Sequence, residues 1–338
     1  MLCTHKVREM SSTLAEPFRV LLTRRLPADL EARLEDSVVV TRRSSDAPPS
    51  EQELLAVVPG HDAVLCMLTE PMTRAVLAAG AASSPPLRLV SQVAVGLDNV
   101  DLGAAGSLGV SVAHTPGVLT DATADLTMAL LLAAARRLSE AERTVREGRW
   151  STWSLGMLTG LELRGATLGI VGLGRIGAAV ARRARAFGMH VVYAGRRAAT
   201  ASLEVELQAR YLPLDELLAT SDVVSLHAPL TEETHHLLSR ERLFAMKPGA
   251  LLVNTARGAL VDEASLADAL ENGPLQFAAL DVFANEPKVH PTLLQRDDVL
   301  LLPHIGSATQ ATRHRMASLA VDAVLDAAAG RPLAHRAV

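Results

Sequence analysis

Three side chains of the kinds that transfer protons and bind anions follow apolar runs in the last third of the chain: Arg257, Glu286 and His304. Histidine titrates near neutrality and a neighbouring carboxylate favours its charged form, so His304 could protonate a developing alkoxide while Glu286 orients it. Arg257 could hold a carboxylate through two N–H groups and polarise an adjacent oxo group. Each residue alone is more often structural, so this interpretation depends on what lies beside them.

A glycine-rich loop supplies that context. The apolar run 167–171 ends in Gly172, Gly174 and Gly177, spaced G-x-G-x-x-G, and a helical pattern and a second β-rich run follow. Within this order, Gly172 permits a tight turn, Gly174 lets the backbone approach a pyrophosphate, and Gly177 lets the helix pack on the strand. The helix N-terminus offers N–H groups and a positive dipole end to the phosphates. The pattern therefore predicts a dinucleotide site.

The end of the second β-rich run indicates which dinucleotide is bound. An NAD site usually places Asp or Glu there to hold the ribose 2′-OH. This chain instead has Arg196 and Arg197 and no acid. Guanidinium groups pair well with a 2′-phosphate, although two solvated arginines in a loop would give the same sequence. We expect NADPH as the cofactor, with NADH possible but less preferred.

Composition limits the other classes of function. The 338 residues are 49% hydrophobic and 3% aromatic, with a formal net charge of −4, so neither nucleic acid nor a membrane is expected as a partner. Two distant cysteines, Cys3 and Cys66, favour a reducing compartment, and residues 1–16 lack the apolar core of a signal peptide. We expect a cytoplasmic protein with no metal site and a polar, disordered extension over residues 1–16.

Apolar, β-rich runs alternate with helical patterns along the chain, which predicts an α/β protein with parallel sheets covered on both faces. The runs of the first third cover residues 18–22, 38–40, 63–68, 87–90 and 110–113, and six further runs begin at residues 167, 191, 222, 250, 277 and 299. We expect two doubly wound parallel-sheet domains. One is a Rossmann cofactor domain inserted in a flavodoxin-like substrate domain.

The domain boundaries follow from this alternation. Residues 17–115 and 307–338 are assigned to the substrate-binding domain, and residues 116–306 to the NADP(H)-binding domain. Within the latter, residues 119–157 are expected to form a dimerisation segment. Its nearly apolar helix should be buried between domains or against another subunit, and it is followed by both tryptophans of the chain, a residue type enriched at interfaces. We therefore expect a homodimer.

Several segments together resemble the D-isomer-specific 2-hydroxyacid dehydrogenase family, and most closely its glyoxylate/hydroxypyruvate reductase branch. The resemblance runs from about residue 18 to the C-terminus. It is carried by the glycine loop and by residues 95–101, 115–125, 254–262, 280–287 and 302–309. We expect no C-terminal regulatory domain of the kind found in many phosphoglycerate dehydrogenases, which argues against that assignment.

The resemblance implies a role for each matching residue. Arg257, Glu286 and His304 are the implied catalytic residues, and the backbone amides of Val95 and Gly96 are implied to hold the substrate carboxylate. Leu68 and Trp153 would bound the substrate pocket, with Trp153 reaching the active site of the other subunit. The implied cofactor contacts are Gly172, Gly174, Arg175, Ile176, Gly177, Arg196, Arg197, Thr255, Ala256 and Asp281, of which Asp281 would bind the nicotinamide carboxamide.

The sequence therefore predicts NADPH-dependent reduction of small 2-oxo acids to D-2-hydroxy acids. Glyoxylate and hydroxypyruvate are the expected substrates, with 2-ketogluconate third. Two alternatives stay open at this point. One is an NAD-dependent 2-hydroxyacid dehydrogenase of other substrate preference, and the other is an NAD(H)-sensing, corepressor-like binding protein that carries the same residues.

Overall fold

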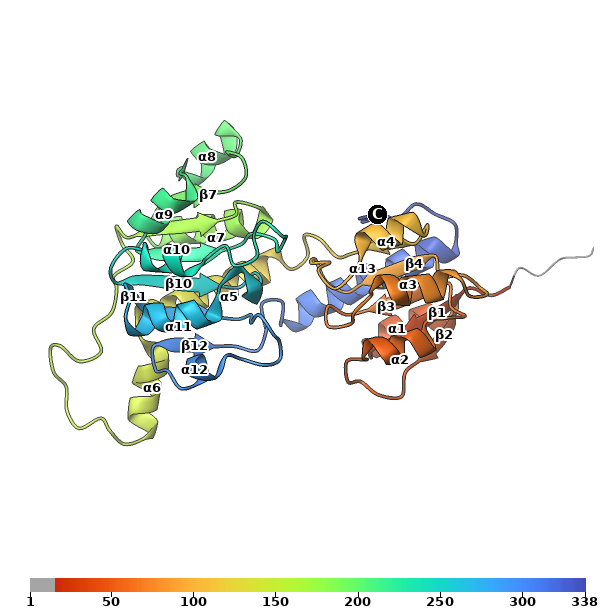
Figure 1. Ribbon diagram of the computed structural model, residues 1–338, viewed down its shortest axis with the longest axis horizontal. Helices are drawn as coiled ribbons and strands as arrows, with labels where there is room; N and C mark the ends of the chain where they lie inside the picture. Colours follow the sequence, from red (N-terminus) through yellow and green to blue (C-terminus); the bar gives the residue numbers. More distant parts are fainter. Residues whose placement is uncertain (1–15) are drawn as a thin grey trace, which may run out of the picture. The chain divides into compact units, whose positions relative to one another are not determined.

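The computed structural model describes residues 16–338, so the expectation for the N-terminal extension lies outside the described residues apart from Glu16. The chain divides into two compact units. The first unit comprises the residues up to Pro116 together with Met316–Val338, and the second unit comprises Gly117–Arg315. Figure 1 shows each unit as a sheet with helices on both of its faces.

The first unit contains a five-stranded parallel sheet in the order β2-β1-β3-β4-β5. Its strands are β1 Arg19–Leu22, β2 Val39–Arg42, β3 Ala63–Cys66, β4 Leu89–Gln92 and β5 Ser111–Ala113. This is the flavodoxin-like order 2-1-3-4-5, as predicted. Every residue of β3 and β4 is buried, which explains why β3 reads as an unbroken rather than alternating apolar run.

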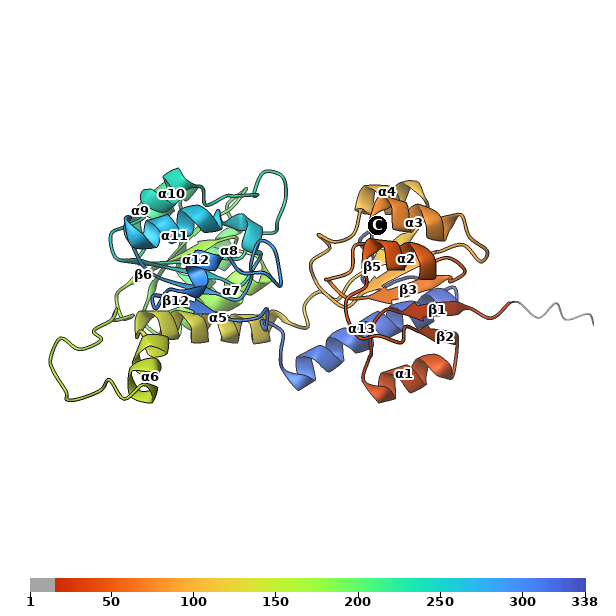
Figure 2. The same ribbon diagram turned by 60° about the horizontal axis from the view of Figure 1, so that its bottom comes forward.

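Helices cover both faces of this sheet. One face carries α2 Glu51–Val57, α3 Arg74–Ala81 and α4 Leu102–Ser107, whose apolar side chains share a core with the strands. The other face carries α1 Ala28–Glu35 and the part of α13 Gln310–Ala328 that belongs to this unit (Figure 2). The short, glycine-containing α4 was not identified from the sequence. Helix α2 begins with a capping box in which Ser50 and Glu53 satisfy each other's backbone N–H groups.

The second unit contains a seven-stranded parallel sheet in the order β12-β11-β10-β9-β6-β7-β8. Its strands are β6 Thr167–Val171, β7 His190–Ala194, β8 Ala209–Tyr211, β9 Val223–Leu226, β10 Ala250–Asn254, β11 Leu275–Leu280 and β12 Val299–Leu301. Counted from β6, this is the Rossmann order 3-2-1-4-5-6 extended by one strand, as the fold class predicted. The expectation of six strands was wrong because β8 is a three-residue edge strand with one buried residue.

Two hydrophobic cores lie on opposite faces of this sheet. The first includes side chains of α5 Thr120–Ala135 and α7 Arg175–Ala186, and the second includes side chains of α9 Leu214–Thr220, α10 Arg240–Phe244 and α11 Glu263–Glu271. The remaining helices are α6 Leu138–Arg146, α8 Ala201–Leu207, α12 Pro291–Leu294 and the 3₁₀ turn Gly258–Leu260.

The apolar helix after Leu119 is shorter than expected. It breaks into α5 and α6 at Arg137, which adopts a left-handed conformation with φ +51°. Helix α5 is buried against α7, β10 and β11 of its own unit. Much of its apolar surface is therefore covered within its own unit, and further burial between domains or against another subunit stays a prediction. Figure 1 shows α6 and the segment after it extending away from the sheet.

Candidate functional site

The glycine loop between β6 and α7 has a geometry that only glycine tolerates at two of its three glycine positions. Gly172 has φ +99°, and a Cβ there would lie 2.8 Å from the backbone N of Ala228. A Cβ on Gly177 would lie 2.3 Å from the carbonyl oxygen of Gly172. These two glycines thus allow the turn after β6 and the close packing of α7 on that strand.

Gly174 and the first turn of α7 face open space. Gly174 has an ordinary φ of −80°, and no atom lies within 4 Å of where its Cβ would be. No side chain caps this helix, and in the described residues the N–H groups of Arg175, Ile176 and Gly177 donate no hydrogen bond. Arg175 is exposed. Open space beside free amides and a helix N-terminus fits the pyrophosphate of a dinucleotide.

The loop after β7 presents Arg196 and Arg197 to solvent. Its backbone is fixed by the two tyrosines: Tyr193 Oη accepts the N–H of Ala199 at 2.7 Å, and Tyr211 Oη donates to the carbonyl of Gly195 at 3.2 Å. Both arginine side chains are exposed, and neither forms a hydrogen bond or ion pair with any residue from 16 to 338. They are therefore available to an anion at the end of β7.

His304 and Glu286 form a close pair beyond the carboxyl ends of β11 and β12. His304 Nδ1 lies 2.8 Å from Glu286 Oε2, and 28% of each side-chain surface stays exposed. The other carboxylate oxygen of Glu286 accepts the backbone N–H of Phe283 at 3.0 Å. Burial raises the pKa of Glu286, but the contact with His304 and this N–H outweigh it and lower the pKa below its usual value. Glu286 is therefore ionised near neutrality.

Asp281 fixes the turn that carries His304. Its side chain is fully buried, and its two oxygens accept the N–H groups of Ile305 and Gly306 at 2.7 and 2.8 Å. Its carbonyl oxygen accepts the N–H of His304, which adopts a left-handed φ of +53°. Burial raises the pKa of Asp281 despite these donors. Anchoring of the turn was not foreseen from the sequence, and contact with a carboxamide stays a prediction.

The loop after β10 positions Arg257. The buried amide of Asn254 donates to the carbonyl of Arg257 at 2.8 Å and accepts the N–H of Ala256 at 3.0 Å. A Cβ on Gly258 would lie 1.8 Å from the carbonyl carbon of Phe283, so this loop lies directly against the loop that leads to Glu286. The structure thereby brings the Arg257 loop and the His304–Glu286 pair to the same edge of one sheet.

Two threonines of α5 form hydrogen bonds with the loop that carries Arg257 and with the turn that carries His304. Thr127 Oγ1 lies 2.9 Å from Thr255 Oγ1, and Thr123 Oγ1 donates to the carbonyl of Gly306 at 3.2 Å. Sequence reasoning treated α5 as an apolar core or interface helix and missed this role. Buried threonines four residues apart in an otherwise apolar helix were the available signal, because a buried hydroxyl needs a partner.

His227, which follows β9, is a further, partly buried titratable group near the glycine loop. Its Nε2 lies 2.9 Å from Ser225 Oγ, and a Cβ on Gly172 would touch the backbone of His227. Burial lowers the pKa of His227 to about 4. The imidazole is therefore neutral near pH 7, which suits a hydrogen-bonding role rather than proton donation.

The first unit carries Leu68, Val95 and Gly96. In the described part of the chain the N–H groups of Val95 and Gly96 donate no hydrogen bond, whereas their carbonyl oxygens accept hydrogen bonds from side chains. His114 Nδ1 lies 2.9 Å from the carbonyl of Val95, and Gln92 donates to that of Gly96 at 2.7 Å. Two successive free amides are a suitable site for a carboxylate. Leu68 is 37% exposed.

Trp153 lies in the segment after α6, with 75% of its surface exposed. Within the second unit, this segment follows the end of α5 opposite to the end at which Thr123 and Thr127 support the catalytic loops. The structure thus groups the predicted catalytic residues and the predicted cofactor contacts at the carboxyl edge of the sheet of the second unit. Trp153 belongs to the same unit but lies away from them.

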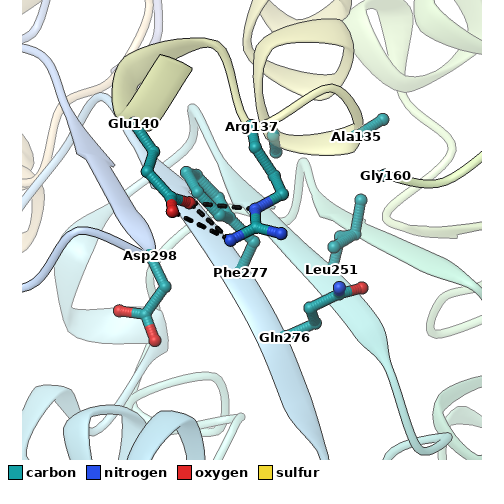
Figure 3. Close-up of a pocket in the computed structure, with 9 residues that line it drawn as sticks. Ala135, Arg137, Glu140, Gly160, Leu251, Gln276, Phe277 and Asp298 are labelled. Atoms are coloured by element: carbon teal, nitrogen blue, oxygen red, sulfur yellow. Dashed lines mark hydrogen bonds and ion pairs between the residues drawn. The ribbon is translucent and has the colours of Figure 1, made fainter. Parts of the chain in front are cut away.

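A cavity of about 240 Å³ lies at the opposite edge of the same sheet (Figure 3). Its walls include Phe277 and Asp298, at the amino ends of β11 and β12, and the ion pair between Arg137 and Glu140, whose atoms approach to 2.8 Å. None of the predicted site residues lines it. The cavity is therefore separate from the edge that carries Arg257 and His304.

Neither a membrane span nor a metal cluster is found in residues 16–338. None of the helices there combines the length and apolar character needed to cross a bilayer, and no three His, Cys, Asp or Glu side chains are grouped to hold a metal ion.

Comparison with known proteins identifies many relatives. The family model "D-isomer specific 2-hydroxyacid dehydrogenase, NAD binding domain" matches residues 128–306. Among curated proteins, the glyoxylate reductase of Korarchaeum cryptofilum is 46% identical over 309 residues, covering 90% of this chain and 91% of the relative.

Solved structures agree with this result. The TT0316 protein of Thermus thermophilus is 46% identical with a TM-score of 0.86, covering 95% of this chain and 100% of that one. An NADPH-dependent glyoxylate/hydroxypyruvate reductase of Sinorhizobium meliloti, solved with NADP and malonate, is 33% identical with a TM-score of 0.82. It covers 95% of this chain and 97% of that one.

Proposed function

This chain belongs to the D-isomer-specific 2-hydroxyacid dehydrogenase family, in its glyoxylate reductase branch, and is an NAD(P)-dependent oxidoreductase; we propose that it reduces small 2-oxo acids to D-2-hydroxy acids with NADPH. Glyoxylate and hydroxypyruvate are the proposed main substrates, and 2-ketogluconate is the third. The S. meliloti relative, which is described as NADPH-dependent, supports this choice of cofactor and substrate.

The observation that carries the proposal is the His304–Glu286 pair, held 2.8 Å apart at the carboxyl edge of the sheet that also carries the glycine loop. In open α/β sheets, ligands bind outside the carboxyl ends of the strands. A proton donor at this edge is therefore placed on the side of the sheet where a dinucleotide would bind. The free amides of α7 and the open space at Gly174 fit such a cofactor.

The proposed mechanism assigns one task to each of the three catalytic residues. When bound, the reduced nicotinamide supplies a hydride to the carbonyl carbon of the substrate. Arg257 binds the substrate carboxylate and polarises the adjacent oxo group, which favours charge development on the oxygen. His304 donates the proton from Nε2 to that oxygen, while Glu286 holds Nδ1 and stabilises the charged imidazole beforehand.

Initial rates with glyoxylate and hydroxypyruvate, each with NADPH and with NADH, test this proposal. Fast oxidation of NADPH with either substrate is the expected result. A preference for NADH would be consistent with the proposed reduction but would contradict NADPH as the cofactor. Cofactor binding without turnover of any 2-oxo acid would contradict the proposed reaction and favour a dinucleotide-sensing protein.

Replacement of Arg196 and Arg197 by alanine is expected to raise KM for NADPH by about 30-fold while changing KM for NADH by less than about threefold. The reason is that charge-assisted hydrogen bonds to the 2′-phosphate contribute roughly 1.5–3 kcal/mol, and NADH lacks that phosphate. Steady-state kinetics with both cofactors measure the effect. Arg210→Ala, at an exposed arginine of β8, is the matched control and should alter neither value. If KM rises equally for NADPH and NADH, Arg196 and Arg197 do not recognise the 2′-phosphate.

We also propose that the chain forms a homodimer through the segment 119–157. Leu138 and Val145 of α6 are 52% and 59% exposed, and Trp150, Trp153 and Leu155 after it are 57%, 75% and 85% exposed. An exposed apolar series of this kind is typical of an interface. Sedimentation should give twice the chain mass, and Trp150→Ser with Leu155→Ser should shift it towards the monomer. A monomeric wild-type protein would contradict the proposal.

A further inference from the structure

Two amide side chains, Gln92 and Asn99, lie behind the loop that carries Val95 and Gly96. Gln92 is fully buried at the end of β4, and Asn99 is partly buried seven residues later. The two amides are paired: Gln92 Nε2 donates to Asn99 Oδ1 at 2.7 Å, and Asn99 Nδ2 donates to Gln92 Oε1 at 3.0 Å. Each amide therefore has one N–H left for another acceptor.

These remaining donors hold the carbonyls of two separate loops. Gln92 Nε2 donates to the carbonyl of Gly96 at 2.7 Å, in the loop that carries the free N–H groups of Val95 and Gly96. Asn99 Nδ2 donates to the backbone carbonyl of Glu70 at 2.8 Å and also lies 3.3 Å from the carbonyl of Met67, at the turn that carries Leu68. The amide pair thus joins the loop after β4 to the turn after β3.

The amide pair is the side-chain link between these two segments. Backbone hydrogen bonds join them at either end, from Val93 N–H to the carbonyl of Cys66 at 2.9 Å and from Met72 N–H to that of Asn99 at 2.8 Å. The turn is closed internally by Glu70, whose buried carboxylate accepts the N–H of Met67 at 2.5 Å. The loop is held on its other side by β5, because Thr115 N–H donates to Ala94 at 2.9 Å and His114 lies against Val95. In a planar trans peptide each N–H points opposite to the preceding carbonyl, so the bonds to the carbonyls of Ala94 and Val95 direct the N–H groups of Val95 and Gly96. The bond from Gln92 holds the next peptide, after Gly96, and so fixes the far side of the same loop.

We propose that the Gln92–Asn99 pair positions the loop that binds the substrate carboxylate and fixes it relative to the Leu68 turn. This rests on the proposed function, in which the amides of Val95 and Gly96 bind that carboxylate. The pair touches neither substrate nor cofactor and acts through the backbone it holds. Its loss should therefore weaken substrate binding and the transition state equally, which raises KM and leaves kcat nearly unchanged.

Two variants test the pair. Gln92→Met keeps the length and bulk of the side chain but removes all of its hydrogen bonds, and Asn99→Ala removes the donor that holds the Leu68 turn. In each, KM for glyoxylate and Ki for oxamate, a non-reducible mimic of a 2-oxo acid, should rise about tenfold, since a misplaced amide loses roughly one charge-assisted hydrogen bond. The dissociation constant for NADPH should stay constant, because the glycine loop belongs to the second unit.

Ser91→Ala is the matched control. Ser91 precedes Gln92 in β4, is also buried, and donates to the carbonyl of Ala320 at 2.8 Å rather than to either loop. This variant should lose thermal stability without any change in KM or Ki. If it raises KM as much as Gln92→Met does, the amide pair has only a structural role and the proposal is overturned.

Hydrogen exchange gives a readout that needs no substrate. Loss of either amide should speed amide exchange in residues 67–72 and 93–100, and Ser91→Ala should not. Unchanged exchange and unchanged Ki in folded Gln92→Met protein would overturn the positioning role, even if Asn99→Ala fails to fold. If the wild-type protein neither reduces glyoxylate nor binds oxamate, the proposed function fails. The exchange experiment then still decides whether the pair holds the loop.

Discussion

His304→Ala is expected to lower kcat for glyoxylate reduction by roughly 10²–10⁴-fold, the usual contribution of a positioned general acid. The reason is that His304 is held against the Glu286 carboxylate, and the turn around it is fixed by the two N–H groups bound to Asp281. Binding of NADPH should be unchanged, because the glycine loop and α7 are untouched. Steady-state kinetics and cofactor titration measure the two effects.

The control for this variant is His190→Ala, at an exposed histidine that begins β7. It should retain the wild-type kcat. Glu286→Gln should give a smaller loss than His304→Ala, since it keeps a hydrogen-bonding partner for the imidazole but removes the negative charge beside it. A His304→Ala protein with near-normal kcat would show that the proton comes from another donor.

Arg257→Ala is expected to raise KM for glyoxylate by about 100-fold, because a bidentate contact with a carboxylate provides two charge-assisted hydrogen bonds. Its effect on kcat should be smaller than that of His304→Ala. Asn254 would still hold the backbone of the loop, so the fold should be retained. Initial rates over a wide range of glyoxylate concentration measure the change.

Arg257→Lys distinguishes charge from geometry. Lysine keeps the positive charge but lacks the planar fork, so it should restore only part of the lost affinity. Arg240→Ala, at an exposed arginine of α10, serves as the control and should leave KM unchanged. If Arg257→Lys behaves like the wild type, a bidentate contact is not what binds the carboxylate.

The alternation of strands and helices in both units and the glycine loop could be predicted because they depend on local signals. An apolar run, a G-x-G-x-x-G turn and a helical pattern are adjacent in the sequence, and the steric limit at Gly177 comes from Gly172 of the same motif. The limit at Gly172 comes from His227 and Ala228 after β9, the neighbouring strand in the sheet. The three residues proposed for catalysis were found for a related reason. Carboxyl ends of parallel strands meet at one edge, so residues that follow such strands share it.

What the sequence did not reveal depends on long-range contacts or on weak local signals. The edge strand β8 has three residues, of which one is buried, so it gives no clear apolar pattern. The contacts of Thr123 and Thr127 with loops more than 100 residues away cannot be read from an apolar helix. Asp281 was assigned a cofactor contact by resemblance, and only the coordinates show that its carboxylate also anchors the turn of His304.

The most direct test of the central claim is the product formed from hydroxypyruvate. The wild-type protein is incubated with hydroxypyruvate and NADPH, and the glycerate formed is resolved by chiral chromatography and compared with the amount of NADPH oxidised. The account predicts D-glycerate in a one-to-one ratio with oxidised cofactor. Formation of L-glycerate, or oxidation of NADPH without glycerate, would contradict it.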